Sequence, residues 1–284
     1  MAAAFDLPEV MLAELMAWAT DLAGDASASL VARPSLFLHA VEYCLQRAAV
    51  VPRDLDFAEV FAGTHRSTNF VVHLGMRAAA FDRDLHPDQD VSLLLGVVLC
   101  GMLVLRVQPG GVVWFSPRCA AWLPWVSRSN HCRSFRDPLG DTSRHDVAEA
   151  NLTAIVGAWL AVVPHARNVF VCIEQPLRSF FFAHPAIRAM LGIVGAERMV
   201  TYLGGFGAAS LKPIELHVTV PVHAALRLRR PFDVAHARLG DGAQRLVEPQ
   251  RGGWLRAAPG MSASQTYPLE FAMAIAETVA LARL

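Results

Sequence analysis

Short apolar runs that alternate with helical stretches dominate the sequence from residue 57 onward. Such alternation is typical of strands joined by crossover helices, in which successive strands lie parallel in one sheet. It predicts an α/β fold with a mostly parallel sheet flanked by helices. The predicted strands are Phe57–Phe61, Met76–Phe81, Val112–Ser116, Asn168–Ile173, Met199–Leu203 and Ile214–Val220, and the predicted helices are Thr68–Leu74, Val91–Val107, Val147–Val163 and Pro185–Val194.

The segments that flank this alternation have a different texture. Residues 1–50 carry apolar residues at helical spacing, which predicts an N-terminal helical extension to a domain spanning 51–284. Residues 221–260 are rich in Gly, Pro and Arg, and we predict a loop-rich, mildly basic insertion there. A closing helix is expected from about Leu269 to Leu281.

Composition limits the classes of protein that fit this pattern. Of the 284 residues, 54% are hydrophobic and 18% are charged, which is enough for a large buried core. The 25 basic residues balance the 25 acidic ones, so the molecule as a whole does not attract polyanions. The five cysteines include no CxxC pair, so we expect a reducing compartment, no disulfide framework and no metal site.

The sequence also bears on location. The N-terminal apolar stretch is not preceded by a basic region, so we expect an intracellular protein, nuclear or cytoplasmic, and not a secreted one. The segment Val91–Leu105 is uncharged and apolar, but it is shorter than the roughly 20 residues that a membrane-spanning helix needs. We expect a buried helix here and no membrane contact.

Two residues at the ends of the first predicted strands suggest a ligand site, because ligands bind outside the carboxyl ends of parallel strands. Gly63 follows the first strand and would let the backbone approach a ligand closely. Asp82 ends the next strand, about 19 residues later, where it could accept hydrogen bonds from both ribose hydroxyls of a nucleoside cofactor. An ordinary turn followed by an ordinary strand-end aspartate is the alternative.

The later strands end in a candidate nucleophile and a candidate acid. Cys119, beside Arg118, is either a thiolate of low pKa or a buried structural cysteine. Glu174 follows a hydrophobic strand, where partial desolvation would raise its pKa and let it donate a proton. An exposed strand-end carboxylate is the alternative for Glu174.

Taken in order, these strand ends resemble the motifs of the DNA (cytosine-5) methyltransferases. Glu59-Val-Phe-Ala-Gly63 is similar to the acidic-Leu-Phe-Ala/Cys-Gly motif of that family, and Asp82 to its ribose-binding acid. Pro117-Arg118-Cys119 resembles the Pro-Cys motif that holds the nucleophile, and Glu174-Gln175-Pro176 resembles the Glu-Asn-Val motif. Asp90-Val91 is similar to the acid-apolar pair that meets the adenine.

The chain is most similar to algal, especially dinoflagellate, members of this group. The motif Gln265-Thr-Tyr-Pro268 resembles their closing motif, which folds back onto the cofactor. Further segments that they share with this chain are Pro109–Trp114, Ser127–Ser129, Asp137–Asp141, Glu174–Ser179 and Gly204–Pro213.

The resemblance implies a Rossmann-like fold of the S-adenosylmethionine-dependent methyltransferase type, with S-adenosylmethionine as cofactor and a nucleobase of DNA or RNA as acceptor. In the implied mechanism the Cys119 thiolate adds to C6 of cytosine, Glu174 holds or protonates N3, and C5 takes the methyl group. The base must leave its stack to react. The residues implied to bind the cofactor are Phe61, Ala62, Gly63, Thr64, Asp82, Asp90, Pro117 and Tyr267.

The chain departs from the family at several points. His65 stands where the family has a second glycine, and a β-carbon could be tolerated there if φ is negative. Arg118 replaces the proline that precedes the nucleophile, and neither a Gln-x-Arg-x-Arg motif nor a target-recognition domain is evident. A catalytically inactive, methyltransferase-like binding or scaffold protein is therefore the alternative function. A nicotinamide-dependent oxidoreductase is disfavoured, because the first turn has a single glycine.

Three other groups of residues have two interpretations each. Trp114, Trp122 and Trp125 either stack a base or pack in the core, and the core is the expectation we favour. Phe180–Phe182 belongs either to the core or to a lid. Ser127–Ser129 either holds a phosphate or is a solvated loop.

Overall fold

A six-stranded sheet organises the chain, with the strands in the order β2-β1-β3-β4-β6-β5. Strand β6 runs antiparallel to both of its neighbours, and the pairs β1–β2, β1–β3 and β3–β4 are parallel. The mostly parallel α/β sheet predicted from the sequence is therefore confirmed. The strands are β1 (Leu55–Val60), β2 (Ala78–Phe81), β3 (Val107–Phe115), β4 (Phe170–Pro176), β5 (Glu197–Tyr202) and β6 (Pro213–Val218).

This computed structural model describes most of the chain. The described residues are 9–23, 28–126, 132–240, 244, 247–249, 255–257 and 266–284.

The order in which the chain adds strands to the sheet reverses direction at β1. The chain adds β2 on one side of β1 through helix α3 (Arg66–His73), and then crosses to β3 on the other side through helix α4 (Leu94–Leu105). Crossover helices that lie on opposite faces leave a crevice outside the carboxyl ends of the strands at such a point. The fold thus directs any ligand site to the edge where β1, β2 and β3 end.

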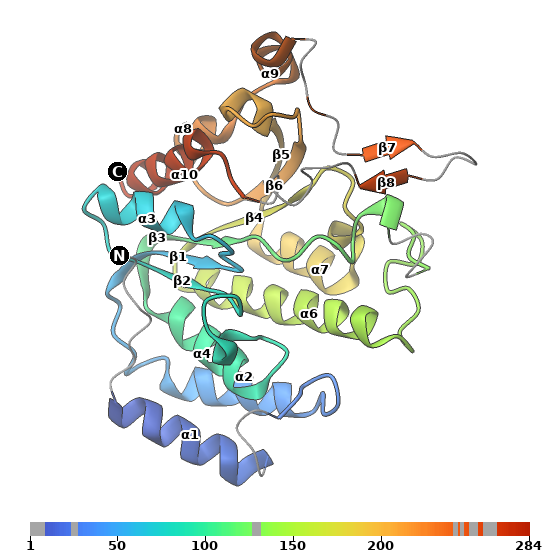
Figure 1. The fold of residues 1–284 in the computed structure, drawn as a ribbon. Helices are drawn as coiled ribbons and strands as arrows, with labels where there is room; N and C mark the ends of the chain where they lie inside the picture. Colours follow the sequence, from blue (N-terminus) through green and yellow to red (C-terminus); the bar gives the residue numbers. More distant parts are fainter. Residues whose placement is uncertain are drawn as a thin grey trace.

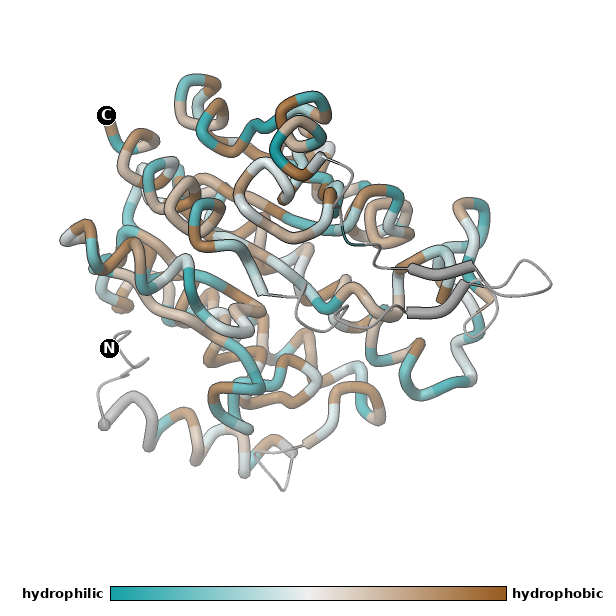
Figure 2. Tube along the Cα trace, turned by 45° about the horizontal axis from the view of Figure 1, so that its top comes forward, coloured by the Kyte–Doolittle hydropathy of each residue, from teal (hydrophilic) through white to brown (hydrophobic). Residues whose placement is uncertain are grey.

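Helices cover both faces of the sheet (Figure 1). Helices α4, α6 (His145–His165) and α7 (Pro185–Val194) lie on one face, and α3 and α10 (Leu269–Ala282) lie on the other. All six residues of β1 are buried, as expected of a parallel strand between two helical layers. Figure 2 shows hydrophobic segments in the middle of the molecule and hydrophilic segments at its edge.

The two N-terminal helices add a further layer outside α4. Helices α1 (Glu9–Ala23) and α2 (Leu36–Arg47) both contact α4, and Leu15 and Cys44 belong to the same hydrophobic core as the sheet. Every residue of α4 is buried, so the expectation of a buried helix in this apolar segment is confirmed.

Helix α6 has a composition that the sequence interpretation did not single out. Among the described residues, it is the helix that is long and apolar enough to cross a membrane, by length and composition alone. It packs on β3 and β4 and against α4 and α7, and half of its most apolar stretch is buried inside the protein. Its apolar residues therefore contribute to the core beneath the sheet.

The prediction of a loop-rich insertion at 221–260 is wrong for residues 222–239, which are mostly helical. This segment contains helix α8 (Val222–Ala225), the 3-10 turn η4 (Leu226–Leu228) and helix α9 (Phe232–Leu239). Prolines suggested a loop, but Pro221 and Pro231 stand at the N-caps, where proline is compatible with the start of a helix. The short strands β7 (Val247–Pro249) and β8 (Leu255–Ala257) form a separate hairpin.

Three basic residues of this segment form contacts within the protein. Arg238 bonds Glu270 of α10 with a shortest distance of 2.6 Å, and Arg227 lies 3.7 Å from Glu277 on the same helix. Arg230 lies over the ring of Phe206, 4.6 Å from its centroid. These contacts use the arginine side chains to hold α8 and α9 against the body of the protein.

A close approach inside the first turn of α4 provides a test of the packing. A β-carbon at Gly96 would clash with the backbone carbonyl of Asp90, whereas one at Gly157 in α6 would meet open space. We expect Gly96→Ala to lower the free energy of unfolding by roughly 2 kcal/mol. Gly157→Ala should raise it by about 0.5–1 kcal/mol through helix propensity. Urea denaturation of both variants checks this, and equal midpoints would contradict it.

Candidate functional site

The loop after β1 is held in an unusual backbone conformation. Phe61, Gly63 and His65 all have positive φ, at 62°, 51° and 45°. The Gly63 N–H donates a 2.9 Å hydrogen bond to Oδ2 of Asp82, at the end of β2, and Asp82 Oδ1 accepts the N–H of Asp84 at 2.8 Å. The two strand ends that the sequence singled out therefore meet, with the aspartate bonded to the glycine of the loop.

His65 does not have the negative φ at which a β-carbon is readily tolerated. Its φ of 45° is left-handed rather than negative, which costs a non-glycine residue roughly 1 kcal/mol. The residue serves as N-cap of α3, and its buried Nδ1 has no hydrogen-bond partner among the described residues. Glycine is thus the residue type that this backbone conformation favours.

The Arg66 side chain forms its hydrogen bond with a residue outside the loop after β1. Its Nη1 donates a 2.8 Å hydrogen bond to the carbonyl of Tyr267, in the closing motif of the chain. The contact fastens the first turn of α3 to a segment 201 residues away.

A buried carboxylate lies beneath this loop. Glu59, on β1, is 1% exposed, and its Oε2 accepts the N–H of Thr68 at 2.9 Å and the Thr68 hydroxyl at 2.6 Å. Thr68 lies in the first turn of α3, where amide groups have no partner inside the helix. Glu59 therefore accepts the hydrogen bond of one such amide group at the helix N-terminus. Burial nevertheless raises the pKa of Glu59 to about 7, because the hydrogen bonds from Thr68 offset only part of the desolvation.

The ends of β3 and β4 meet around the Tyr267 side chain. The Tyr267 hydroxyl donates to Oε2 of Glu174 at 3.0 Å and lies 2.7 Å from the Ser116 hydroxyl. The Trp114 indole N–H lies 2.9 Å from Ser116 Oγ and 3.3 Å from the Tyr267 hydroxyl. This cluster brings the candidate acid and the closing motif together at one edge of the sheet.

Glu174 is not the exposed carboxylate of the alternative interpretation. It is 8% exposed, and burial raises its pKa, while the charge of Lys212 and the hydrogen bond from Tyr267 act in the opposite direction. A carboxyl group in this environment is suited to holding a proton.

Cys119 lies close enough to Glu174 for the glutamate charge to change the pKa of the thiol. Burial raises the pKa of the Cys119 thiol, the negative charge of Glu174 raises it further, and Lys212 and Arg118 lower it. The low pKa expected from the neighbouring Arg118 is therefore wrong. The physical reason is burial, which outweighs the nearby positive charges. Arg118 opposes it only weakly, because its side chain is 66% exposed and lies 4.0 Å from Asp84.

A second hydrogen-bond chain supports the segment that carries Cys119. The Gln175 Nε2 donates to the carbonyl of Pro117, and Gln175 Oε1 accepts the Ser179 hydroxyl at 3.0 Å. Both side chains are buried. Pro117 is thus held by β4, the strand that also carries Glu174.

The remaining predicted cofactor residues lie along the same loops. Ala62 is buried, Phe61 is half-buried, and Gly63 and Thr64 are exposed. Asp90 accepts the N–H of Ser92 at 2.8 Å and lies 3.6 Å from Arg83, so its carboxylate stabilises its own loop. Its contact with a cofactor stays a prediction.

Several other expectations are resolved by burial. Trp114 and Trp122 are each 1% exposed, and Phe180 and Phe181 are buried, so these rings are core residues. Ser127–Ser129 and Gln265 lie outside the described residues. Within the described residues, no group of three potential metal ligands occurs.

No protein-family model and no curated protein matches this sequence. The site is therefore interpreted from its geometry. Sequence reasoning did not assign site roles to Thr68, Ser116, Gln175 or Lys212. Lys212 is the single lysine of the chain, and that rarity was the one signal that could have directed attention to it.

The buried Glu59 predicts an unusual dependence of stability on pH. Because the folded pKa of about 7 exceeds the unfolded value, folded Glu59 keeps a proton that the unfolded chain loses as pH rises from about 4.5 to 7. Its contribution is fully present below the unfolded pKa and is lost as pH rises, by on the order of 3 kcal/mol. Glu59→Gln should flatten this part of the profile in urea denaturation. The exposed Glu42→Gln is the control, and an unchanged profile in Glu59→Gln would contradict the assignment.

The charges around Cys119 predict how its reactivity responds to substitution. In a Cys132→Ser background, which removes an exposed thiol, Cys119 should be alkylated by iodoacetamide only above the pH usual for a cysteine. Glu174→Gln should shift the midpoint to lower pH, and Lys212→Met should shift it to higher pH. Peptide mass spectrometry across a pH series measures both shifts, and shifts in one common direction would refute the arrangement.

Proposed function

We propose that this protein is an S-adenosylmethionine-dependent methyltransferase that acts on a nucleobase, of the cytosine-C5 type, with Cys119 as nucleophile and Glu174 as acid. The observation that carries the proposal is the Tyr267 cluster. Tyr267 bonds Glu174 through its hydroxyl and Arg66 through its carbonyl. The cofactor loop, the acid and the closing motif are thereby joined at the edge where the sheet reverses.

The fold is compatible with this proposal. Helices on both faces of a mostly parallel sheet, with a reversal at β1, suit a Rossmann-like domain that binds a nucleoside cofactor at the strand ends. The candidate acceptor is a base of DNA or RNA that has left its stack.

The residues around the first loop fit a nucleoside. A β-carbon at Gly63 would meet nothing within 4 Å, so space is open above the loop. The Asp82 carboxylate uses one lone pair on each oxygen for Gly63 and Asp84, and each oxygen keeps another for a ribose hydroxyl. When bound, S-adenosylmethionine supplies an electrophilic methyl group on its sulfonium.

The protein groups have distinct roles in this proposal. The raised pKa of Glu174 favours uptake of a proton, and the protonated carboxyl group would donate a hydrogen bond to N3 of the base and make C6 more electrophilic. Cys119 must lose its thiol proton as its sulfur adds to C6, and the positive charge of Lys212 favours that loss. Tyr267 keeps the Glu174 carboxyl in place.

A specific observation favours the alternative, a catalytically inactive protein that keeps the fold for binding or as a scaffold. His65 lies in a left-handed conformation at the cofactor loop, with a buried nitrogen that lacks a partner among the described residues. Together with the raised pKa of Cys119, this arrangement is less prepared for catalysis than the family pattern implies.

Calorimetric titration with S-adenosylmethionine and S-adenosylhomocysteine tests the proposal. We expect binding, and we expect Asp82→Asn to weaken it roughly tenfold or more through the loss of charged hydrogen bonds. The matched control is Asp88→Asn, an exposed aspartate in the same connection, which should bind as the unaltered protein does. The absence of binding at millimolar ligand would contradict both the cofactor and the activity.

Covalent trapping then separates the active from the inactive alternative. An oligonucleotide that contains 5-fluorocytosine should form an adduct with the unaltered protein and none with Cys119→Ser. Cofactor binding without any adduct would favour the inactive alternative or a different acceptor.

A further inference from the structure

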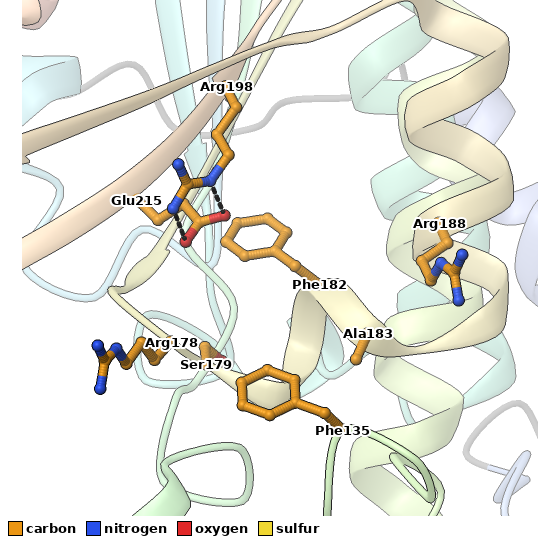
Figure 3. Close-up of a pocket in the computed structure, with 8 residues that line it drawn as sticks. All are labelled: Phe135, Arg178, Ser179, Phe182, Ala183, Arg188, Arg198 and Glu215. Carbon is orange, nitrogen blue, oxygen red and sulfur yellow. Dashed lines mark hydrogen bonds and ion pairs between the residues drawn. The ribbon is translucent and has the colours of Figure 1, made fainter.

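A cleft of about 420 Å³ opens beside the carboxyl end of β4 (Figure 3). Its walls come from the segment after β4, from α7, from β5 and β6, and from the loop that carries Phe135. Gln175 and its register partner Glu215 lie on the sheet face toward this cleft, whereas the alternation of side chains directs Glu174 to the opposite face. The cleft is thus separate from the Tyr267 cluster but lies at the same edge of the sheet.

The charge of the cleft is positive. Three arginines and one glutamate line it, a formal excess of two positive charges. Arg198 bonds Glu215 twice, at 2.9 and 3.1 Å, and His217 lies 3.0 Å from the same carboxylate, so the single acid is already paired. Arg178 and Arg188 are exposed, and neither forms an ion pair within the described part of the chain. Both can bind an anion without breaking an internal contact.

Aromatic rings lie between these two arginines. Phe135 is 56% exposed, which is unusual for a large apolar ring, and its back rests against Phe180 at a centroid distance of 4.9 Å. Phe182 is half-buried, with its ring 4.3 Å from that of His217. In Figure 3 the Arg178 and Arg188 side chains stand on opposite sides of the two phenylalanine rings.

The loop that presents Phe135 is fixed by a buried arginine. Arg133 is 1% exposed, its guanidinium lies 3.9 Å from the centroid of the Trp122 ring, and it donates to Asn151 at 2.8 Å and to the Pro138 carbonyl. Because these contacts already fix the loop, less conformational entropy of the loop is lost when a ligand stacks on Phe135.

The cleft is connected to the segment of Cys119 by short contacts. Ser179, which lines the cleft, bonds Gln175, and Gln175 bonds the carbonyl of Pro117. Cys119 follows two residues later. These contacts link one wall of the cleft to the segment that carries the candidate nucleophile.

We propose that this cleft binds a single-stranded polynucleotide, with backbone phosphates on Arg178 and Arg188 and a base stacked on Phe135. The inference rests on the proposed function, because a base that reacts with Cys119 must belong to a strand held nearby. Alternating cations and aromatic rings suit a strand with unstacked bases, which stack on side chains independently of sequence. A duplex fits less well, because its bases are paired and cannot reach Phe135.

Fluorescence anisotropy with fluorescein-labelled 12-nucleotide DNA and RNA strands of mixed sequence tests the proposal. We expect Arg178→Ala and Arg188→Ala each to weaken binding several-fold at low salt and to reduce the slope of log affinity against log salt by about 0.7. Phe135→Ala should weaken binding by roughly fivefold or more. Arg53→Ala, which removes an exposed arginine just before β1, at the opposite edge of the sheet, is the charge-matched control and should bind normally. Thermal unfolding midpoints establish that each variant is folded.

Three outcomes would overturn the cleft proposal. These are unchanged affinity in both arginine variants, tighter binding of a duplex than of either strand, and equal competition by inorganic polyphosphate together with no effect of Phe135→Ala. A preference between the DNA and RNA strands identifies which polynucleotide is held.

Titration with S-adenosylmethionine on the same preparation separates the two proposals. Cofactor binding without strand binding overturns the cleft alone, and strand binding without cofactor binding overturns the methyltransferase and leaves the cleft standing.

Discussion

The hydrogen bonds from Thr68 to the buried carboxylate of Glu59 tie the first turn of α3 to the end of β1. Only five residues connect β1 to α3, so the attachment requires a tight turn. Three residues of this turn have positive φ. The same turn directs the Gly63 amide to Asp82 and the Arg66 side chain to Tyr267. A carboxylate buried in this way is expensive, and the elevated pKa of Glu59 is the direct expression of that cost.

Glu174 and Gln175, which are adjacent on β4, point to opposite faces of the sheet at its carboxyl edge. Glu174 points toward α3 and α10, where it meets Tyr267, and Gln175 points toward α7, where it supports Pro117. Because side chains alternate along a strand, adjacent residues serve opposite faces. The reactive groups and the cleft of Arg178, Arg188 and Phe135 can therefore lie close together without sharing side chains.

Long-range contacts decide the electrostatics of the candidate site. The Cys119 thiol, the Glu174 carboxyl and the Lys212 ammonium come from three different segments. Glu174 and Lys212 change the pKa of Cys119 in opposite directions, and Lys212 also lowers the pKa of Glu174. Arg118 is the nearest cation in sequence, yet its influence on Cys119 is smaller than that of Lys212, because its side chain turns toward Asp84. A cation that is distant in sequence therefore lowers the pKa of Cys119 more than the adjacent cation does.

Local patterns in the sequence were sufficient to determine the order and type of most elements. The apolar runs predicted all six strands of the sheet, and the periodicity predicted α7 with its observed bounds, because burial between helical layers imposes those patterns locally. Helices α8 and α9 were missed because their N-cap prolines resemble loop residues. The sequence also identified Gly63 and Asp82 as strand-end residues, and the structure adds the hydrogen bond that joins them.

Only the tertiary structure decided the left-handed conformation of His65, the raised pKa of Cys119, the place of Lys212 and the cleft around Phe135. Each of these depends on burial and on contacts between segments far apart along the chain. Arg66 and Tyr267, for example, are separated by 201 residues. The sequence determined which residues end the strands, and the packing of distant segments around those ends decided their conformation, charge and accessibility.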